Sequence, residues 1–353
     1  MTLTIAVTGM NARADNPGPG LAIARCLNES SLATRIVGLS YEALDPGLYH
    51  RNYIDKGYIL PYPSHGEDAL LSCLADLHAR EHFDIIIPCL DAEMLSFARL
   101  APALSSSMGI RTFLPNAQQL AMRSKDRLSE LAYVAGFSVP YTQPVYQASF
   151  FHSCEMQGWR YPLIVKGLYY DAKLAYNADE AVAAFHRIAG EWGLPVLAQR
   201  WIQGEEVNLA GVGDGEGGLT GAVMMKKRAL TDKGKGWAGI SIHNEELLSA
   251  AQGFCAATRW RGGLELEMLR DETGALHLIE INPRFPAWVY LSVGVDCNLP
   301  ELLVRLALGE KIMPLPAPSA GVMFIRYAEE VIVPLAEFEN ITLWGETLHN
   351  GIK

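Results

Sequence analysis

The first third of the chain alternates short apolar runs with amphipathic segments, and this alternation constrains the fold more than any other feature. The apolar, strand-like runs are residues 3–9, 33–40, 83–91 and 110–115. Helical patterns lie between them, for example at 21–27 and 66–82. Strands that alternate with helices form a parallel sheet. The sequence therefore predicts a Rossmann-like α/β domain over residues 1–113.

The pattern becomes mixed after residue 113. A helix is expected over 116–136, and after it strands, turns and helices follow in no regular alternation up to residue 312. A mixture of this kind is typical of α+β folds. The remaining segment, 313–353, reads as a strand-rich extension, with two strands expected in 320–338. The predicted fold class is therefore α/β followed by α+β.

Charge and cysteine usage exclude several classes of protein. The formal net charge of −10 argues against a nucleic-acid or anionic-membrane partner, because such partners call for a basic surface. The six cysteines include no CxxC pair and no zinc-finger spacing, which favours a reducing, cytoplasmic location. No run of about 18 apolar residues offers a membrane span, and the first ten residues lack the pattern of a signal peptide.

An acidic hairpin ends in the stretch LHLIEINPRF, residues 276–285. With residues 271–274 as the turn, Arg270 faces Ala275 and Glu265 faces Glu280. Side chains alternate along a strand, so one face of the hairpin collects several polar groups. These are Glu265, Glu267, Glu280, Asn282 and Arg284.

Carboxylates placed opposite each other destabilise a strand pair unless a positive group lies between them. Magnesium fits, because it is a hard cation that prefers carboxylate and carbonyl oxygens together with substrate phosphates. The alternative is a solvated strand end with Arg284 as the counter-ion. Spacing alone leaves both interpretations open.

The motif LIEINPRF, with Glu267 thirteen residues before Glu280, resembles the ATP-grasp superfamily of carboxylate–amine or carboxylate–thiol ligases, in an arrangement like that of biotin carboxylase and carbamoyl-phosphate synthase. The resemblance implies ATP and Mg²⁺ as cofactors, with Mn²⁺ as a substitute metal. It makes Glu267, Glu280 and Asn282 the metal ligands, and Arg284 a contact of the triphosphate or acyl phosphate. Glu265 has no clear counterpart in the family.

The same resemblance organises the rest of the chain. It implies that residues 1–113 precede an ATP-grasp domain pair over 114–312. That pair would consist of a lid at about 140–200 and a central mixed sheet.

Three lysines are implied as phosphate contacts of ATP. Lys125 opens a helix that stops at a Gly-x-x-x-Pro pattern, and Lys166 ends the apolar strand YPLIVKG. A lysine at the end of an apolar strand must bring its ammonium to water or to an anion. The glycine-rich loop that usually follows in the family is missing here, and Lys173 is expected to replace part of its function.

The segment VLAQRWIQGEE resembles the adenine-binding hinge of the family. Adenine would be met by backbone groups of Gln199, Arg200, Trp201 and Ile202. Glu206 would accept hydrogen bonds from the ribose hydroxyls, and its neighbour Glu205 is expected to be exposed. The alternative is an ordinary strand–turn–strand with solvated acids.

The substrate side is predicted from residues that surround the hairpin in the sequence. Lys227 and Arg228 lie in the basic stretch 226–236, expected to be either a loop that folds over an anionic substrate or the γ-phosphate, or an ordinary solvated basic loop. Arg13 is expected to bind a substrate carboxylate, and either Asp91 or Glu93 an amine, although turn or helix-capping roles fit all three residues equally well. Trp288 is a candidate for substrate selection, with core packing as its alternative.

The sequence thus predicts an enzyme that activates a substrate carboxylate as an acyl phosphate and joins it to an amine, releasing ADP and phosphate. The substrates would be small molecules or peptides, and a homodimer is one expected assembly because dimers are common among similar enzymes. One alternative is an ATP-binding regulatory protein without turnover. A second is a zinc hydrolase that uses the H-x-x-E-H pattern at residues 78–82.

Overall fold

The computed structural model describes residues 2–124, 128–168, 171–316 and 318–348. The chain divides into two compact units, and each is described by itself. Unit 1 comprises Met1–Gln118, Asn208–Glu265 and Asn282–Lys353, and unit 2 comprises Gln119–Val207 and Leu266–Ile281. The domain boundaries expected from the sequence stay a prediction.

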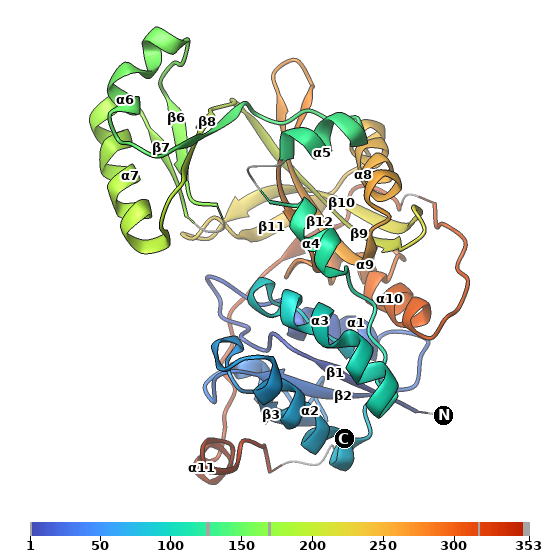
Figure 1. Ribbon diagram of the computed structural model, residues 1–353. Coiled ribbons are helices and arrows are strands. Elements are labelled where there is room, and N and C mark those ends of the chain that lie inside the picture. Colours follow the sequence, from blue (N-terminus) through green and yellow to red (C-terminus); the bar gives the residue numbers. More distant parts are fainter. Residues whose placement is uncertain (1, 125–127, 169–170, 317, 349–353) are drawn as a thin grey trace. The chain divides into compact units, whose positions relative to one another are not determined.

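Unit 1 contains the expected parallel sheet (Figure 1). Its strands are β1 (Leu3–Val7), β2 (Thr34–Ser40), β3 (Lys56–Ile59) and β4 (Ile85–Ile87), in the order β3-β2-β1-β4. The accompanying helices are α1 (Gly20–Asn28), α2 (Glu67–Glu81) and α3 (Asp91–Met108). Strand residues such as Ile5, Ile36 and Ile85 are fully buried, because this sheet is covered by other elements and needs apolar side chains on both faces. The α/β part of the fold prediction is confirmed.

Three details of the sequence prediction are wrong. Residues 110–115 form no strand; Arg111 alone bridges to Ile85. Strand β3 was missed, because its four residues are too short to show a pattern. Among the described residues of the C-terminal segment only β14 (Met323–Ile325) is a strand, and the second expected strand is replaced by helix α11 (Leu335–Trp344). That helix begins directly after Pro334, a residue compatible with a helix start, and ends at Gly345 in the left-handed region.

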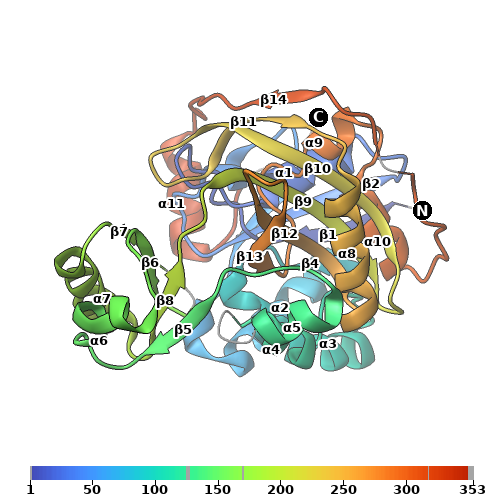
Figure 2. The same cartoon turned by 90° about the horizontal axis from the view of Figure 1, so that it is seen from above.

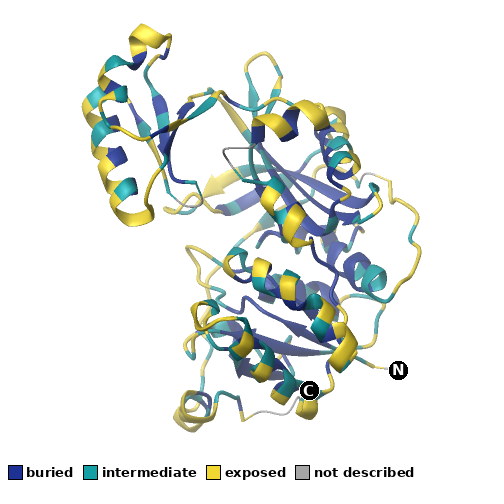
Figure 3. Ribbon diagram, in the orientation of Figure 1, coloured by how far each residue is buried: buried dark blue, intermediate teal, exposed yellow. Residues whose placement is uncertain are grey.

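A six-stranded sheet has the order β13-β12-β9-β10-β11-β14 (Figure 2). Its further strands are β9 (Gly204–Asp214), β10 (Leu219–Leu230), β11 (Gly236–Ser241), β12 (Arg261–Asp271) and β13 (Leu276–Asn282). Helices α8 (Glu245–Thr258) and α10 (Leu299–Ala307) pack against β10, and the short helix α9 (Leu291–Gly294) precedes α10. Figure 3 shows that the strands hold most of the buried residues of this region.

Unit 2 contains an antiparallel sheet of order β5-β8-β6-β7. Its strands are β5 (Thr142–Val145), β6 (Leu163–Lys166), β7 (Ala172–Ala175) and β8 (Val196–Arg200). Helices α6 (Phe150–Ser153) and α7 (Ala178–Trp192) cover one face, and Asn177 caps α7 by accepting the backbone N–H of Glu180. The unit also includes α5 (Leu128–Ala135), and α4 (Ala117–Met122) lies where the two units meet in the sequence. None of the described helices is both long and apolar enough to cross a bilayer.

Candidate functional site

A buried carboxylate, Glu265, is the centre of a polar cluster in unit 1. It lies on β12 and is only 4% exposed. Its Oε1 accepts hydrogen bonds from Asn208 Nδ2 (3.1 Å) and Trp288 Nε1 (2.8 Å). Its Oε2 accepts one from Asn282 Nδ2 (2.9 Å). Sequence reasoning set Glu265 opposite Glu280 and gave it no role; the structure places it against Asn282 and Trp288, and only the tertiary contacts reveal this.

Asn282, a predicted metal ligand, is fixed in one orientation by this contact. Its amide nitrogen is turned toward Glu265, so its Oδ1 points the other way. An oriented amide oxygen is the group that a hard cation would use. Trp288, predicted to select substrate, is buried and holds Glu265 in place through its indole N–H.

Arg284 and Asp91 form an ion pair at the edge of the same cluster. Arg284 Nε and Nη2 both lie 2.9 Å from Asp91 Oδ2, and Nη1 lies 3.9 Å from Glu265 Oε2. Asp91 is the first residue of α3, where the helix dipole also favours a negative charge. Asp91 is therefore the counter-ion of Arg284 in this structure, and its contact with a substrate amine stays a prediction.

Glu93 is enclosed by hydrogen-bond donors of the protein itself, and its contact with a substrate amine stays a prediction. The residue is fully buried, and its carboxylate accepts hydrogen bonds from the hydroxyls of Thr8 and Tyr41. It also accepts the backbone N–H groups of Cys89 (2.8 Å) and Leu90 (2.9 Å). Burial raises the pKa of Glu93, and the surrounding donors act against that rise. Glu93 accepts backbone N–H groups where β4 passes into α3, and this is the helix-capping role that the sequence offered as an alternative.

The hairpin that carries the predicted metal ligands has a turn one residue shorter than expected. Asp271 N–H donates to the carbonyl of Ala275 (3.0 Å), so Asp271 rather than Arg270 faces Ala275. Gly274 takes a φ of 91°, which glycine tolerates and which three-residue turns require. Farther along β13, Leu278 and Ile281 are both buried although they are three residues apart, so the regular alternation is broken between them.

Glu267 on β12 and Glu280 on β13 are both half-buried, and their strands are neighbours in the sheet. Glu280 and Asn282 are alternate residues of one strand, so their side chains share a face. Magnesium ligation by Glu267, Glu280 and Asn282 stays a prediction.

Lys166 lies in unit 2 at the end of β6 and is only 4% exposed. A buried ammonium needs a nearby anionic or polar partner, so this position fits the predicted phosphate contact better than a solvated lysine would. Lys173 is exposed on the neighbouring strand β7, opposite Val165. Lys125 lies outside the described residues.

The segment predicted to bind adenine lies partly in a strand, and adenine binding by it stays a prediction. Gln199 lies inside β8, which pairs with β5 on one side and with β6 on the other. The N–H of Arg200 donates to the carbonyl of Tyr141 (2.9 Å), so the ladder already uses this part of the backbone. Binding of adenine by Gln199 and Arg200 would therefore have to use backbone groups of a strand that pairs on both sides. Trp201 and Ile202 lie in the link between β8 and β9.

Two acids follow the hinge on β9. Glu206, predicted to bind ribose, is half-buried. Glu205 is exposed and pairs with Arg270 at 2.9 Å, which confirms the expectation that it faces solvent. Ribose binding by Glu206 stays a prediction.

Lys227 and Arg228 are not in a loop, contrary to the prediction. Both belong to β10, which continues to Leu230 and pairs with β11. Arg228 is exposed at a bulge between Lys227 and Ala229. A bulge changes the direction in which nearby side chains point. The side chains of these two residues therefore do not follow the regular alternation between the two faces of the sheet.

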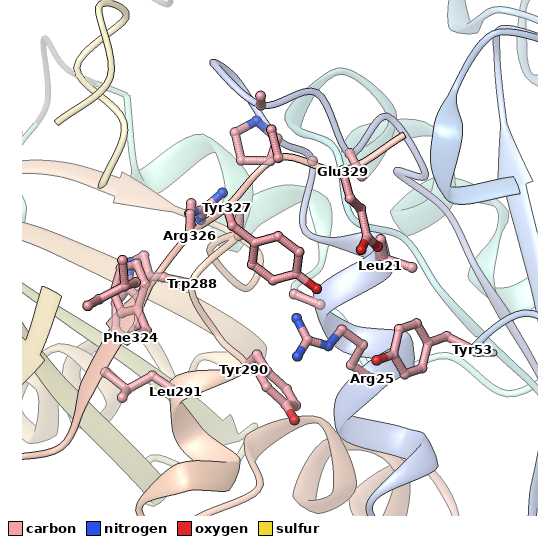
Figure 4. Close-up of a pocket in the computed structure, with 18 of the residues that line it drawn as sticks. Leu21, Arg25, Tyr53, Trp288, Tyr290, Leu291, Phe324, Arg326, Tyr327 and Glu329 are labelled. Carbon is pink, nitrogen blue, oxygen red and sulfur yellow. The ribbon is translucent and has the colours of Figure 1, made fainter. Parts of the chain in front are cut away.

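Unit 1 also encloses a cavity of about 720 Å³. It is lined by the N-terminal loop, helix α1, residues 287–294 and residues 322–331, and we call it the Arg25 cavity (Figure 4). Arg13, predicted to bind a carboxylate, lies on its wall, is 61% exposed and forms a 3.7 Å ion pair with Asp45. Trp288 lines the cavity as well, so this one side chain connects it with the Glu265 cluster.

Two cations of this cavity, Arg25 and Arg326, were not singled out from the sequence. Arg326 follows β14, and among the described residues no acid forms an ion pair with its guanidinium. Burial lowers its pKa to about 10. Arg25 lies on an ordinary amphipathic helix and Arg326 follows a short strand, and neither setting distinguishes a cavity arginine from a surface arginine in the sequence.

Comparisons with known proteins agree with this architecture. No family model and no curated protein sequence matches the chain. Solved structures do: biotin carboxylase from Campylobacter jejuni is similar with a TM-score of 0.67 at 16% identity, over 91% of this chain and 74% of that one. The L-amino acid ligase from Bacillus licheniformis gives 0.63 at 15%, over 87% and 74%. N5-carboxyaminoimidazole synthetase from Staphylococcus aureus, complexed with ADP, gives 0.63 at 16%, over 90% and 79%.

The chain has the ATP-grasp fold. Identities this low establish the fold alone. The ATP-grasp expectation for the mixed and antiparallel sheets is confirmed with it.

The residues expected to hold the metal in an ATP-grasp site suit magnesium. They offer two carboxylates and one amide oxygen, all hard donors, and the amide is held by Glu265. Within the part of the chain that the structure describes, no group of three or more His, Cys, Asp or Glu side chains is arranged to hold a metal. The predicted set contains only two such residues.

The zinc-hydrolase alternative is not supported by the structure. Glu81, its proposed base, pairs with Arg35 (2.5 Å) and accepts the Tyr58 hydroxyl. The rings of His78 and His82 lie 6.2 Å apart, and His82 has left the helix with a φ of 53°. No third ligand joins them among the described residues.

Proposed function

We propose that the protein is an ADP-forming ATP-grasp ligase that joins a carboxylate to an amine. The observation that carries the proposal is the Glu265 cluster, in which a buried carboxylate orients Asn282 and lies beside Arg284. A chain that needed only a stable core would not bury an acid and two asparagines beside an arginine, because burying polar groups is costly unless they are paired. The ATP-grasp fold supports the same interpretation.

The proposed reaction has two steps. The substrate carboxylate oxygen attacks the γ-phosphorus of ATP, the bond to the bridging oxygen breaks, and ADP leaves with that electron pair. The amine nitrogen then attacks the carbonyl carbon of the acyl phosphate, the C–O bond to phosphate breaks, and the nitrogen loses one proton. The products are an amide, ADP and phosphate.

The residues act mainly by positioning and electrostatics, as is general for phosphoryl transfer. Lys166 would neutralise phosphate charge from its buried position on β6. Arg284, held by Asp91, would stabilise negative charge that develops on the transferred group. When bound to Glu267, Glu280 and Asn282, magnesium would supply charge neutralisation on the phosphates. Cytoplasmic location and a homodimer stay predictions.

Thermal unfolding with and without MgATP tests the proposal. A ligand that binds only the folded state raises the unfolding midpoint, so MgATP should stabilise the wild type. Glu280→Ala should lose most of that shift, whereas Glu272→Ala, an exposed glutamate of the same hairpin, should keep it. Phosphate release is then measured with mixtures of carboxylates and amines.

The outcomes separate the candidate functions. Phosphate release that depends on both substrates supports the ligase. Binding of MgATP without any turnover would support the regulatory alternative. No shift at millimolar MgATP would remove both.

A further inference from the structure

The Arg25 cavity has the size and composition of a small-molecule site. Its volume of about 720 Å³ falls within the range typical of such sites, and its walls combine apolar and aromatic side chains with a few charges. Leu21, Trp288, Leu291 and Phe324 provide apolar surface (Figure 4). The charged groups lie among them, so the cavity is suited to a ligand with an apolar body and ionised ends.

Arg25 is placed in this cavity as a preformed anion contact. Its guanidinium carbon lies 3.7 Å from the ring centre of Tyr290 and 5.5 Å from that of Tyr53. Two aromatic rings hold the group by cation–π contacts, which do not use its Nε–H donor. Its Nε is buried without a hydrogen-bond partner, and no acid within the described chain forms an ion pair with it. Tyr327 directs its hydroxyl into the same end of the cavity (Figure 4).

Two acids, Glu29 and Glu329, line the same cavity as Arg25, and neither forms an ion pair with it in the described structure. Glu29 accepts the hydroxyl of Tyr290. Glu329 lies 2.9 Å from His50 Nε2, and this contact lowers its pKa. A cation beside two carboxylates matches a zwitterion better than a simple anion, because each charge of the ligand then meets the opposite charge.

We propose that the Arg25 end of the cavity binds the free α-carboxylate of an amino-acid-like substrate with an apolar or aromatic side chain. This inference rests on the proposed ligase function, for which the amino acid would be the amine partner. As the amine partner, the amino acid must not react through its carboxylate. The Arg25 guanidinium, which lies between Tyr53 and Tyr290, would hold that carboxylate at this end of the cavity. The amino group meets carboxylates there, and the side chain packs on the apolar wall.

Binding of matched ligands to the full chain tests this proposal without catalysis. Calorimetric titrations use L-phenylalanine and L-leucine, each beside its carboxamide, which lacks the negative charge but keeps the side chain and the amine. Both acids should bind at least about tenfold more tightly than their amides, since a charge-assisted hydrogen bond contributes roughly twice as much as a neutral one. Arg25→Met should abolish this preference.

Two further variants control for folding and for the substitution itself. Arg99→Met changes an exposed arginine of α3 that pairs with Glu67, and should leave the preference unchanged. Arg25→Lys keeps the charge but loses the planar fork, and should bind the acids at least about threefold more weakly than the wild type. Amide binding and the unfolding midpoint show whether each variant is folded.

The proposal is overturned if none of the four ligands binds at 10 mM, which is roughly a hundredfold above an ordinary substrate affinity. It is also overturned if acid and amide bind alike, or if the Arg25 variants keep the wild-type preference. MgATP titrations of the same samples separate this failure from failure of the ligase proposal. Amino-acid binding without MgATP binding would reject the ligase and leave the cavity assignment standing.

Discussion

Replacing Glu265 by glutamine is expected to reverse the amide of Asn282. The carboxylate uses Oε1 for Asn208 and Trp288 and Oε2 for Asn282. A glutamine oxygen at the Oε1 position keeps the first two bonds. Its NH₂ group then lies at the Oε2 position and faces another NH₂ group, that of Asn282. The conflict is removed when Asn282 turns by 180° and accepts with its Oδ1, which withdraws that oxygen from a metal.

The cost in stability should be moderate and the cost in metal affinity larger. Hydrogen bonds to a charged group contribute about 1.5–3 kcal/mol and neutral ones about 1, so three weakened bonds suggest a loss of roughly 2–4 kcal/mol. Partners that orient a metal ligand typically change metal affinity by about 10–100-fold. Glu265→Gln should therefore raise the magnesium concentration for half-maximal ADP formation by about that factor, with much of the rate recovered at saturating magnesium.

Asn208→Ala is the matched control. It removes another partner of Glu265, at 3.1 Å, but leaves the contact with Asn282 in place. We expect a loss of stability of about 1 kcal/mol and an unchanged magnesium requirement. The reasoning is refuted if Glu265→Gln destabilises the protein without changing its magnesium dependence, or if Asn208→Ala changes that dependence equally.

Three further predictions concern stability. Glu93→Ala leaves the Thr8 and Tyr41 hydroxyls and the Leu90 N–H without their acceptor, so urea unfolding should show a loss of about 3–5 kcal/mol, against less than about 0.5 for the exposed Glu246→Ala; equal losses would contradict the role of Glu93. Hydrogen bonds from Thr273 and His277, together with backbone N–H groups, lower the pKa of Asp271. A lowered carboxyl pKa stabilises the fold above the unfolded value of about 3.8 and loses that effect as the pH falls. Asp271→Asn should therefore lower the unfolding midpoint at pH 7, and this difference should become smaller as the pH falls below 3.8. A constant difference would argue against this. Arg326→Met should not destabilise the ligand-free protein, because burial lowers the pKa of Arg326 from 12.5 to about 10 and so costs at most about 3 kcal/mol at neutral pH. A lower midpoint for that variant would show that Arg326 stabilises the fold instead.

The sequence by itself determined the features that depend on neighbours in the chain. The alternation of apolar runs and helices fixed the parallel sheet of unit 1, because a strand covered on both faces needs continuous apolar residues. The pattern of acids at the end of an apolar strand, Glu267 and then Glu280, indicated the ATP-grasp fold. Both signals lie within short stretches of the chain, so they can be recognised without knowledge of the fold.

Tertiary structure decided the contacts between distant segments. Asn208, Glu265 and Trp288 meet although 80 residues separate the first from the last, and neither Glu265 nor Arg25 stands out from its local sequence. The same holds for Glu93, where only the packing of Tyr41 and β1 shows that the carboxylate is a buried hydrogen-bond acceptor. A side chain's charge can be read from the sequence, but its partners depend on which strands and helices the folded chain brings together.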